Sequence, residues 1–212
     1  TSSTISGYKM DDSRTNTLAY NLDYLALFEH GYVYNALTAT RGWQLAGEAR
    51  NFWRANYRLE GNYAFNKYLG VNARFSAQIS NRRELQSSEQ FQLGGVNTIR
   101  GYEEGMVNGE RGYALQAELR GNIKSLWQSA PSWLDTAEFF AFYDCGQLKH
   151  KTESEALSSA SEAFLSSTGC GLRCGLLQHL NASFTMAMPL KKHTYNLRDN
   201  KPHWLFGVTA EF

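Results

Sequence analysis

The chain has 212 residues, a formal net charge of +1 and a mean hydropathy of −0.47. This length allows one large all-β domain or two small ones, and the near-zero charge lacks the basic footprint of nucleic-acid-binding proteins, so we expect no nucleic-acid partner. No apolar run reaches the roughly eighteen residues of a membrane-spanning helix, but a transmembrane β-barrel stays possible because its strands alternate lipid-facing and lumen-facing residues.

Period-two alternation of apolar and polar residues predicts about ten β-strands. They are expected at residues 2–9, 15–27, 32–40, 53–65, 69–79, 113–120, 137–145, 169–178, 180–190 and 204–212. The clearest pair flanks a tight turn at Asn66-Lys67. These two strands run about twelve residues, which exceeds the about five or six of an average globular strand and suits the about nine to eleven of a tilted membrane strand.

The connections between these strands alternate in length. Turns at 66–67 and near His179 are short, whereas long loops are expected at 81–111, 148–167 and 191–202, and residues 42–50 are expected to form a further loop. Short turns on one side and long loops on the other are typical of bacterial outer-membrane barrels. The turn at 123–134 is longer than this pattern expects, and its Trp127 and Trp133 suit a membrane interface.

Residues 91–112 read FQLGGVNTIRGYEEGMVNGERG and hold six of the chain's eighteen glycines. A long glycine-rich connection must stay disordered or fold back onto something, because backbone groups that leave water need hydrogen-bond partners. Its arginine, Arg100, favours folding back. The motifs Gly94-Gly95 and Ile99-Arg100-Gly101-Tyr102, which follow Ser87-Ser88-Glu89-Gln90-Phe91, resemble the outer-membrane transporters of two-partner secretion, the TpsB family of hemolysin and adhesin secretion and activation proteins.

The resemblance runs from about residue 51 to residue 212 and implies a fold and a function. It implies an all-β fold, a transmembrane antiparallel β-barrel of sixteen strands, of which residues 1–212 would be the C-terminal part with loop 81–111 folded inward. The family's two periplasmic POTRA domains and a signal peptide are expected to be absent from this chain. The implied function is secretion of a large unfolded exoprotein, a hemolysin, an adhesin or a contact-dependent inhibition toxin, across the outer membrane of a Gram-negative bacterium without a cofactor.

The resemblance also implies a site. The segment Phe142-Tyr143-Asp144-Cys145-Gly146 matches the family's F-x-D-x-G wall motif, so the loop arginine, Arg100, is expected to pair with Asp144, with Glu118 as a lesser partner. Alternation independently places both acids on the polar, lumen-facing side, and a desolvated guanidinium needs a carboxylate. The alternative is an exposed turn arginine and an ordinary lumen acid.

Two further features concern biogenesis and the cysteines. The terminal Phe212 ends an amphipathic strand and resembles the signal that the barrel-assembly machinery reads, so this machinery and outer-membrane lipid are expected partners. The spacing of Cys145, Cys170 and Cys174 allows a disulfide between the first two. The favoured alternative makes all three small apolar residues on a lipid face.

The residues predict no enzyme and no metal site. The five histidines are scattered, and no serine or cysteine nucleophile has a base at readable spacing. Three other functions stay open beside the transporter: a barrel-insertion factor of the same superfamily, a passive pore and a soluble β-sandwich. Residues 87–91 favour the secretion branch, a passive pore would lack the match of Arg100 to Asp144, and strand length argues against the sandwich.

Overall fold

A computed structural model describes residues 15–44, 51–81, 85, 87–127, 129–150, 161–191 and 201–211. Nine of its strands form one sheet, in the order β1-β2-β3-β4-β7-β8-β9-β10-β11, and every neighbouring pair is antiparallel. The strands are β1 (Thr15–Phe28), β2 (Gly31–Gln44), β3 (Phe52–Ala64), β4 (Leu69–Ser80), β7 (Arg111–Asn122), β8 (Leu134–His150), β9 (Ser161–Leu176), β10 (Leu180–Pro189) and β11 (His203–Ala210).

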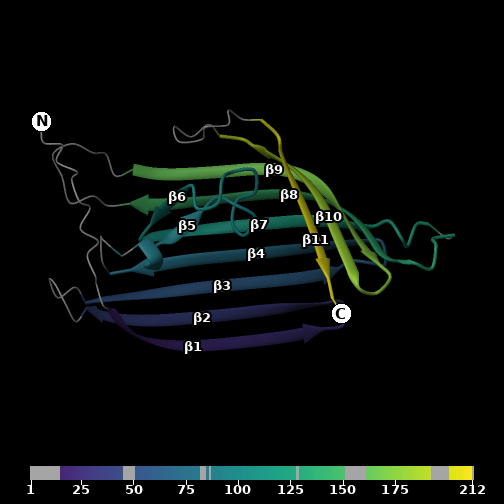
Figure 1. The fold of residues 1–212 in the computed structure, drawn as a ribbon. Coiled ribbons are helices and arrows are strands. Elements are labelled where there is room, and N and C mark those ends of the chain that lie inside the picture. Colours follow the sequence, from purple (N-terminus) through teal and green to yellow (C-terminus); the bar gives the residue numbers. More distant parts are fainter. Residues whose placement is uncertain are drawn as a thin grey trace, which may run out of the picture.

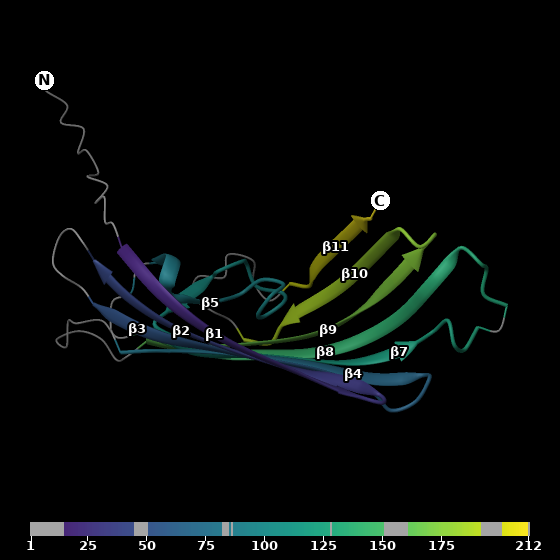
Figure 2. The ribbon, with the colours of Figure 1, turned by 90° about the horizontal axis from the view of Figure 1, so that it is seen from below.

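The connection between β4 and β7 carries its own small structure. It contains a short 3₁₀ helix, η1 (Ser87–Glu89), and the strands β5 (Phe91–Leu93) and β6 (Val107–Gly109), which pair in a separate two-stranded sheet. The large sheet is curved like a trough, and β5 lies on its concave side (Figures 1 and 2). The described sheet does not close, and β1 and β11 are its edges.

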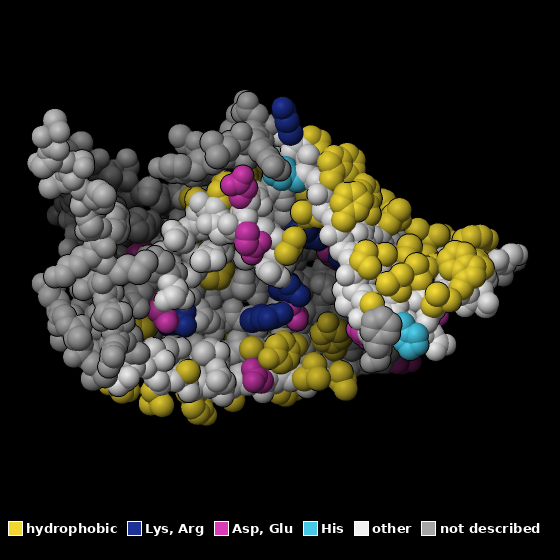
Figure 3. All heavy atoms as spheres, viewed as in Figure 1, with side chains coloured by type: hydrophobic (Ala, Val, Ile, Leu, Met, Phe, Trp, Pro, Cys, Tyr) yellow, Lys and Arg dark blue, Asp and Glu magenta, His cyan; other side chains and the backbone are white. Residues whose placement is uncertain are grey.

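The two faces of the sheet differ in polarity, as the alternation predicts. Large apolar side chains of the convex face are exposed, among them Trp53, Ile79, Leu119, Phe139, Tyr143, Leu172, Phe206 and Val208. The concave face instead buries polar side chains such as Gln78, Gln116 and Asp144, and charged side chains gather in the hollow of the sheet (Figure 3). A soluble sandwich would bury its apolar face, so this arrangement argues against that alternative and matches a membrane barrel.

Most predicted strands agree with the structure to within a few residues, including the hairpin around Asn66-Lys67. The turn after β9 is tight: Leu176 pairs with Leu180, and two of the three residues between them, Leu177 and Gln178, have left-handed φ values of 53° and 63°. Among the described residues, no helix is long and apolar enough to cross a membrane.

The predicted loop at 148–167 was too long. Strand β8 continues to His150 and β9 begins at Ser161, with Leu148 paired to Ala163. The reason is that Leu148 and Leu165 are both buried, at 2% and 0% exposure, in a cluster with the β4–β7 loop, which the serine-rich and glutamate-rich sequence around them does not reveal. Likewise β2 continues to Gln44, into the loop expected at 42–50.

Four predictions concern segments that lie wholly or partly beyond the part of the chain that the structure describes. The strand at 2–9 and the terminal Phe212 lie outside the described residues, as do most of the loop at 191–202 and residues 45–50.

Candidate functional site

The loop between β4 and β7 folds back into the trough because glycines let its backbone reverse. Gly94 and Gly95 have φ values of 108° and 93°, which L side chains rarely adopt. The Thr98 hydroxyl closes this turn, since it accepts a hydrogen bond from the Gly94 N–H at 3.0 Å and donates one to the Gly94 carbonyl at 2.9 Å. Gly101 at the tip has φ 88°, and a Cβ built there would lie only 3.3 Å from the Cβ of Ala187 on β10.

Apolar side chains anchor the loop on the sheet. A buried cluster joins loop residues with strands β7, β8 and β9: Leu93, Ile99, Tyr102, Ala114, Leu148 and Leu165. Leu93 and Ile99 are fully buried, and burying each such side chain stabilises the docked loop by about 1.5–3 kcal/mol. Gly146 makes room for them, because a Cβ there would lie 2.9 Å from Leu93 Cδ2 and 3.2 Å from Ile99 Cδ1.

Arg100 makes the polar part of this junction. Its Nε donates to Asp144 Oδ2 and its Nη2 to Asp144 Oδ1, both at 2.7 Å, and its backbone N–H donates to Oδ2 at 3.1 Å. Its Nη1 donates to Glu118 Oε1. The guanidinium also stacks on Phe142, 3.7 Å from the ring centroid. The structure therefore brings together Arg100, Asp144 and Glu118, which the resemblance implied would pair, and adds Phe142 of the wall motif.

This junction is almost free of water contact. Arg100 is 7% exposed and Asp144 is 0% exposed. Burial by itself would lower the pKa of Arg100, but its hydrogen bonds and ion pairs with Asp144 and Glu118 outweigh burial and raise that pKa, so the guanidinium stays charged. A buried pair of this kind fixes the register of loop and wall more than it adds net stability, because desolvation offsets much of the attraction.

Tyr102 connects the loop by hydrogen bonds to strand β9 and to the residue that follows β10 by two positions. Its hydroxyl lies 2.9 Å from the carbonyl oxygens of Ser166 on β9 and Lys191 after β10, and it accepts a hydrogen bond from the Lys191 N–H at 3.3 Å. The tip of the loop thus contacts three wall strands in succession, β8 through Asp144, β9 through Ser166 and β10 through Ala187.

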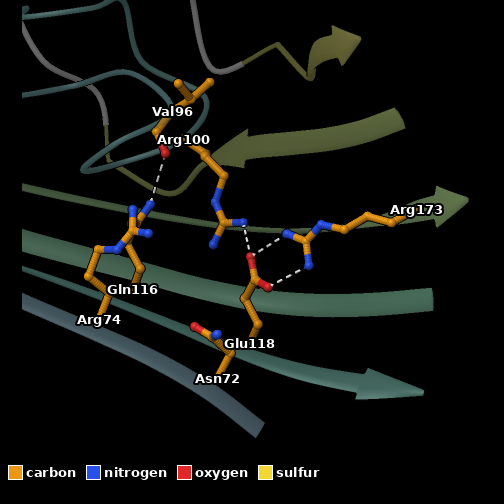
Figure 4. A pocket seen from close by; sticks show the side chains of 7 residues that line it. All are labelled: Asn72, Arg74, Val96, Arg100, Gln116, Glu118 and Arg173. Carbon is orange, nitrogen blue, oxygen red and sulfur yellow. Dashed lines mark hydrogen bonds and ion pairs between the residues drawn. The ribbon is translucent and has the colours of Figure 1, made fainter. Parts of the chain in front are cut away.

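Arg173 on β9 is a functional candidate that the sequence reasoning missed. Its Nη1 and Nη2 donate to Glu118 Oε2 and Oε1 at 2.9 and 3.0 Å, so Glu118 holds two arginines at once (Figure 4). Its guanidinium stacks on Phe140, 3.9 Å from the ring centroid. The period-two phase of β9 could have placed Arg173 on the lumen face, but no motif marks it.

Glycines on β9 make these stacks possible. Phe140 pairs directly with Gly171, and Phe142 with Gly169. A Cβ at Gly171 would lie 2.4 Å from Phe140 Cζ, and one at Gly169 would lie 2.7 Å from Phe142 Cζ. The rings therefore lie over the glycines and leave their other faces to the arginines.

The base of the loop has a second polar anchor, which the sequence also did not reveal. Arg54 on β3 forms an ion pair with Glu89 of η1, with its Nη2 2.8 Å from Oε2. Its Nη1 and the Gln78 Nε2 both donate to the Glu89 carbonyl, at 3.2 and 2.9 Å.

A small polar cavity of about 250 Å³ lies beside the Arg100 junction (Figure 4). Its lining residues are Asn72, Arg74, Val96, Arg100, Gln116, Glu118 and Arg173. Gln116 closes one side by donating from Nε2 to the Val96 carbonyl at 3.1 Å. Within the described ranges, no group of three or more His, Cys, Asp or Glu side chains could hold a metal ion.

The three cysteines are free. The disulfide that the spacing allowed is not formed, because Cys145 pairs with Ser166 while Cys170 pairs with Ala141, four positions along β8. Cys145 also faces Leu115, and Cys174 faces Ala137.

The family model for haemolysin secretion/activation proteins, ShlB/FhaC/HecB, matches residues 1–174. The chain belongs to this family. This ShlB/FhaC/HecB family is one of transport and secretion proteins and not of enzymes.

Two curated proteins of similar sequence are both named heme/hemopexin transporter protein HuxB, and both come from Haemophilus influenzae. The protein of strain 86-028NP is 27% identical over 156 residues, and that of strain ATCC 51907 / DSM 11121 / KW20 / Rd is 27% identical over 158 residues. Each alignment covers 71% of this chain and 26% of the relative. The chain therefore spans about a quarter of the length of the curated relatives it matches.

Among solved structures, CdiB from Escherichia coli is similar, with a TM-score of 0.74 at 20% sequence identity. The similarity covers 92% of this chain and 36% of the CdiB chain. At this identity the likeness shows the fold alone. The predicted fold class, part of a large antiparallel β-barrel, is thereby confirmed.

Proposed function

We propose that this chain is the C-terminal part of an outer-membrane transporter of two-partner secretion, whose barrel passes one large, unfolded exoprotein to the outside of the cell. The observation that carries the proposal is the loop that folds into a polar trough and is held there by Arg100 on Asp144 and Glu118. Its convex face of exposed apolar side chains suits outer-membrane lipid. The remaining strands and the periplasmic domains would lie in the part of the relatives that the chain does not cover.

The interior surface fits an unfolded polypeptide better than a specific small ligand. On the concave face of β1 to β3, side chains such as Asn21, Thr38 and Asn56 line an open hollow beside Phe91 of the loop. Amide and hydroxyl groups can exchange hydrogen bonds with the backbone of any passing sequence. The docked loop fills the neighbouring part of the trough, so the proposal includes a step in which the loop leaves the wall during passage.

The cargo is proposed as an exoprotein encoded with the transporter. A hemolysin, an adhesin and a contact-dependent inhibition toxin all fit, and the name of the HuxB relatives adds a heme/hemopexin-related cargo. The barrel-assembly machinery would insert the parent protein into the membrane.

A barrel-insertion factor is the second candidate, because the arginine tripeptide is shared across the larger superfamily. The secretion branch is favoured by the family match and by relatives that are named as transporters.

The test is to delete the gene of the full-length parent protein and to assay the culture medium for the exoprotein encoded beside it. We expect the exoprotein to disappear from the medium while other outer-membrane proteins stay at normal levels, and the parent gene on a plasmid to restore it. Persistent secretion with poorly assembled barrels would indicate an insertion factor. Unchanged secretion and unchanged barrels would indicate a passive pore.

A further inference from the structure

The Glu118 carboxylate binds two arginines, one on the loop and one on the barrel wall. Arg100 belongs to the loop, whereas Arg173 belongs to β9 and Glu118 to β7, both within the wall. Arg173 donates hydrogen bonds to both carboxylate oxygens of Glu118, whereas Arg100 donates only to Oε1. When the loop leaves the wall, the contact between Arg173 and Glu118 can persist, and the contact between Arg100 and Glu118 cannot.

The charges of these residues determine whether Arg173 strengthens or weakens the docking of the loop. With the loop docked, two arginines face two acids, Glu118 and Asp144. Without Arg100 the wall keeps one arginine against two acids, and without Arg173 as well it would keep two acids alone. Arg173 therefore makes the vacated wall less negative and lowers its attraction for Arg100. It also repels Arg100 directly, because both guanidiniums bind the same oxygen.

The two neighbouring arginines, Arg74 and Arg120, are paired with other acids and do not neutralise Glu118 in place of Arg173. Arg74, which also lines the cavity, is engaged by Glu60. Arg120 lies 3.8 Å from Glu138, which is the cross-strand partner of Arg173. Stacking on Phe140 holds the Arg173 guanidinium in place without any contribution from the loop.

We propose that Arg173 is a release residue: it holds Glu118 when Arg100 departs and so sets how readily the loop undocks. This inference rests on the proposed function, in which the loop leaves the wall during transport. Arg173 is a positioning residue, because it acts on the loop through Glu118. A residue that merely braced Glu118 for Arg100 would have the opposite effect on docking.

The probe is a cysteine beneath the loop. Ala114 is 2% exposed and lies in the cluster that the docked loop covers. We would introduce Ala114→Cys into the full-length parent protein, with Cys145, Cys170 and Cys174 changed to alanine, purify it in detergent without any exoprotein, and measure the rate of thiol labelling. Because the thiol reacts only when the loop opens, the rate reports the open fraction. Increasing urea raises opening in every variant and yields a rate even where the parent opens slowly.

Arg173→Gln is expected to slow labelling about fivefold or more, at the low end of typical coupling between sites. Arg173→Lys should give an intermediate rate, because it keeps a charge but not the bidentate fork. In a Glu118→Gln background the Arg173→Gln change should have a smaller effect, because only the direct repulsion between the two arginines remains. Arg58→Gln is the matched control, since that arginine of β3 pairs with Glu60, which Arg74 still engages, and its rate should equal the parent's.

Faster labelling or an unchanged rate in Arg173→Gln, at each urea concentration, would overturn the proposal. A gel-mobility assay of the folded barrel confirms that all variants are assembled before labelling. Because the measurement needs no exoprotein, it is independent of the deletion test: a failed export result leaves these rates intact, and an unexpected rate leaves the transporter proposal intact.

Discussion

Export of the exoprotein is expected to fall at least about tenfold when Arg100 is replaced with alanine, while the amount of assembled barrel stays at the parental level. Asp144 is fully buried and receives three hydrogen bonds from Arg100. Removing one partner of a buried ion pair costs about 3–5 kcal/mol, which favours the undocked loop by more than about a hundredfold. Because the loop has to leave the wall during export and dock again afterwards, we expect a loop that cannot dock to lie in the path and obstruct it.

Immunoblots of the culture medium measure the exported exoprotein, and immunoblots of outer membranes measure the assembled barrel. Arg100→Lys is the matched variant, and it should restore only part of the export because an ammonium cannot make the two parallel hydrogen bonds to Asp144 while also reaching Glu118. Normal export at normal barrel levels in Arg100→Ala would remove this arginine from the mechanism.

The second large effect is expected at Gly146, where Gly146→Val should undock the loop by steric conflict. A Cβ there would lie 2.9 Å from Leu93 Cδ2 and 3.2 Å from Ile99 Cδ1 of the docked loop, and 2.7 Å from the carbonyl oxygen of Tyr113 within the wall, so the gel-mobility assay of the folded barrel is needed here too. Overpacking a well-packed site typically costs about 1–3 kcal/mol, so thiol labelling of the Ala114→Cys probe should accelerate about tenfold and export should fall.

Gly121→Val provides the control for this change. Gly121 lies on the neighbouring strand β7, and a Cβ there meets only the Phe139 carbonyl oxygen at 3.8 Å. Both variants add the same side chain to a wall strand, but only the one at Gly146 intrudes on the loop. Equal labelling rates in the two variants would show that Gly146 does not form a docking site.

The sequence predicted what depends on local periodicity and on recognisable motifs. The alternation around Asn66-Lys67 gave strands, a turn and the two faces of the sheet, because a period of two follows directly from strand geometry. The tripeptide at Arg100 and the wall motif at Asp144 predicted two partners 44 positions apart along the chain. Neither prediction required knowledge of packing.

What the sequence did not reveal depends on contacts between distant strands. Arg173 reaches Glu118 across β8, and its position relative to Arg100 follows from the register of three strands. The ion pair of Arg54 with Glu89 likewise requires the path of the folded loop. The glycines at 169 and 171 look like flexible positions in the sequence, yet each lies under an aromatic ring in the structure.

The most direct test of the account is to lock the docked loop and to measure export. Val96 of the loop and Gln116 of β7 are joined by a 3.1 Å hydrogen bond and line the same cavity. In the cysteine-free parent protein, Val96→Cys and Gln116→Cys together would be treated with a short, reducible thiol cross-linker, and each single cysteine variant would serve as the control. We predict that cross-linking stops export and that reduction restores it. Export at the parental rate with the loop fully cross-linked would contradict the claim that the loop must leave the wall.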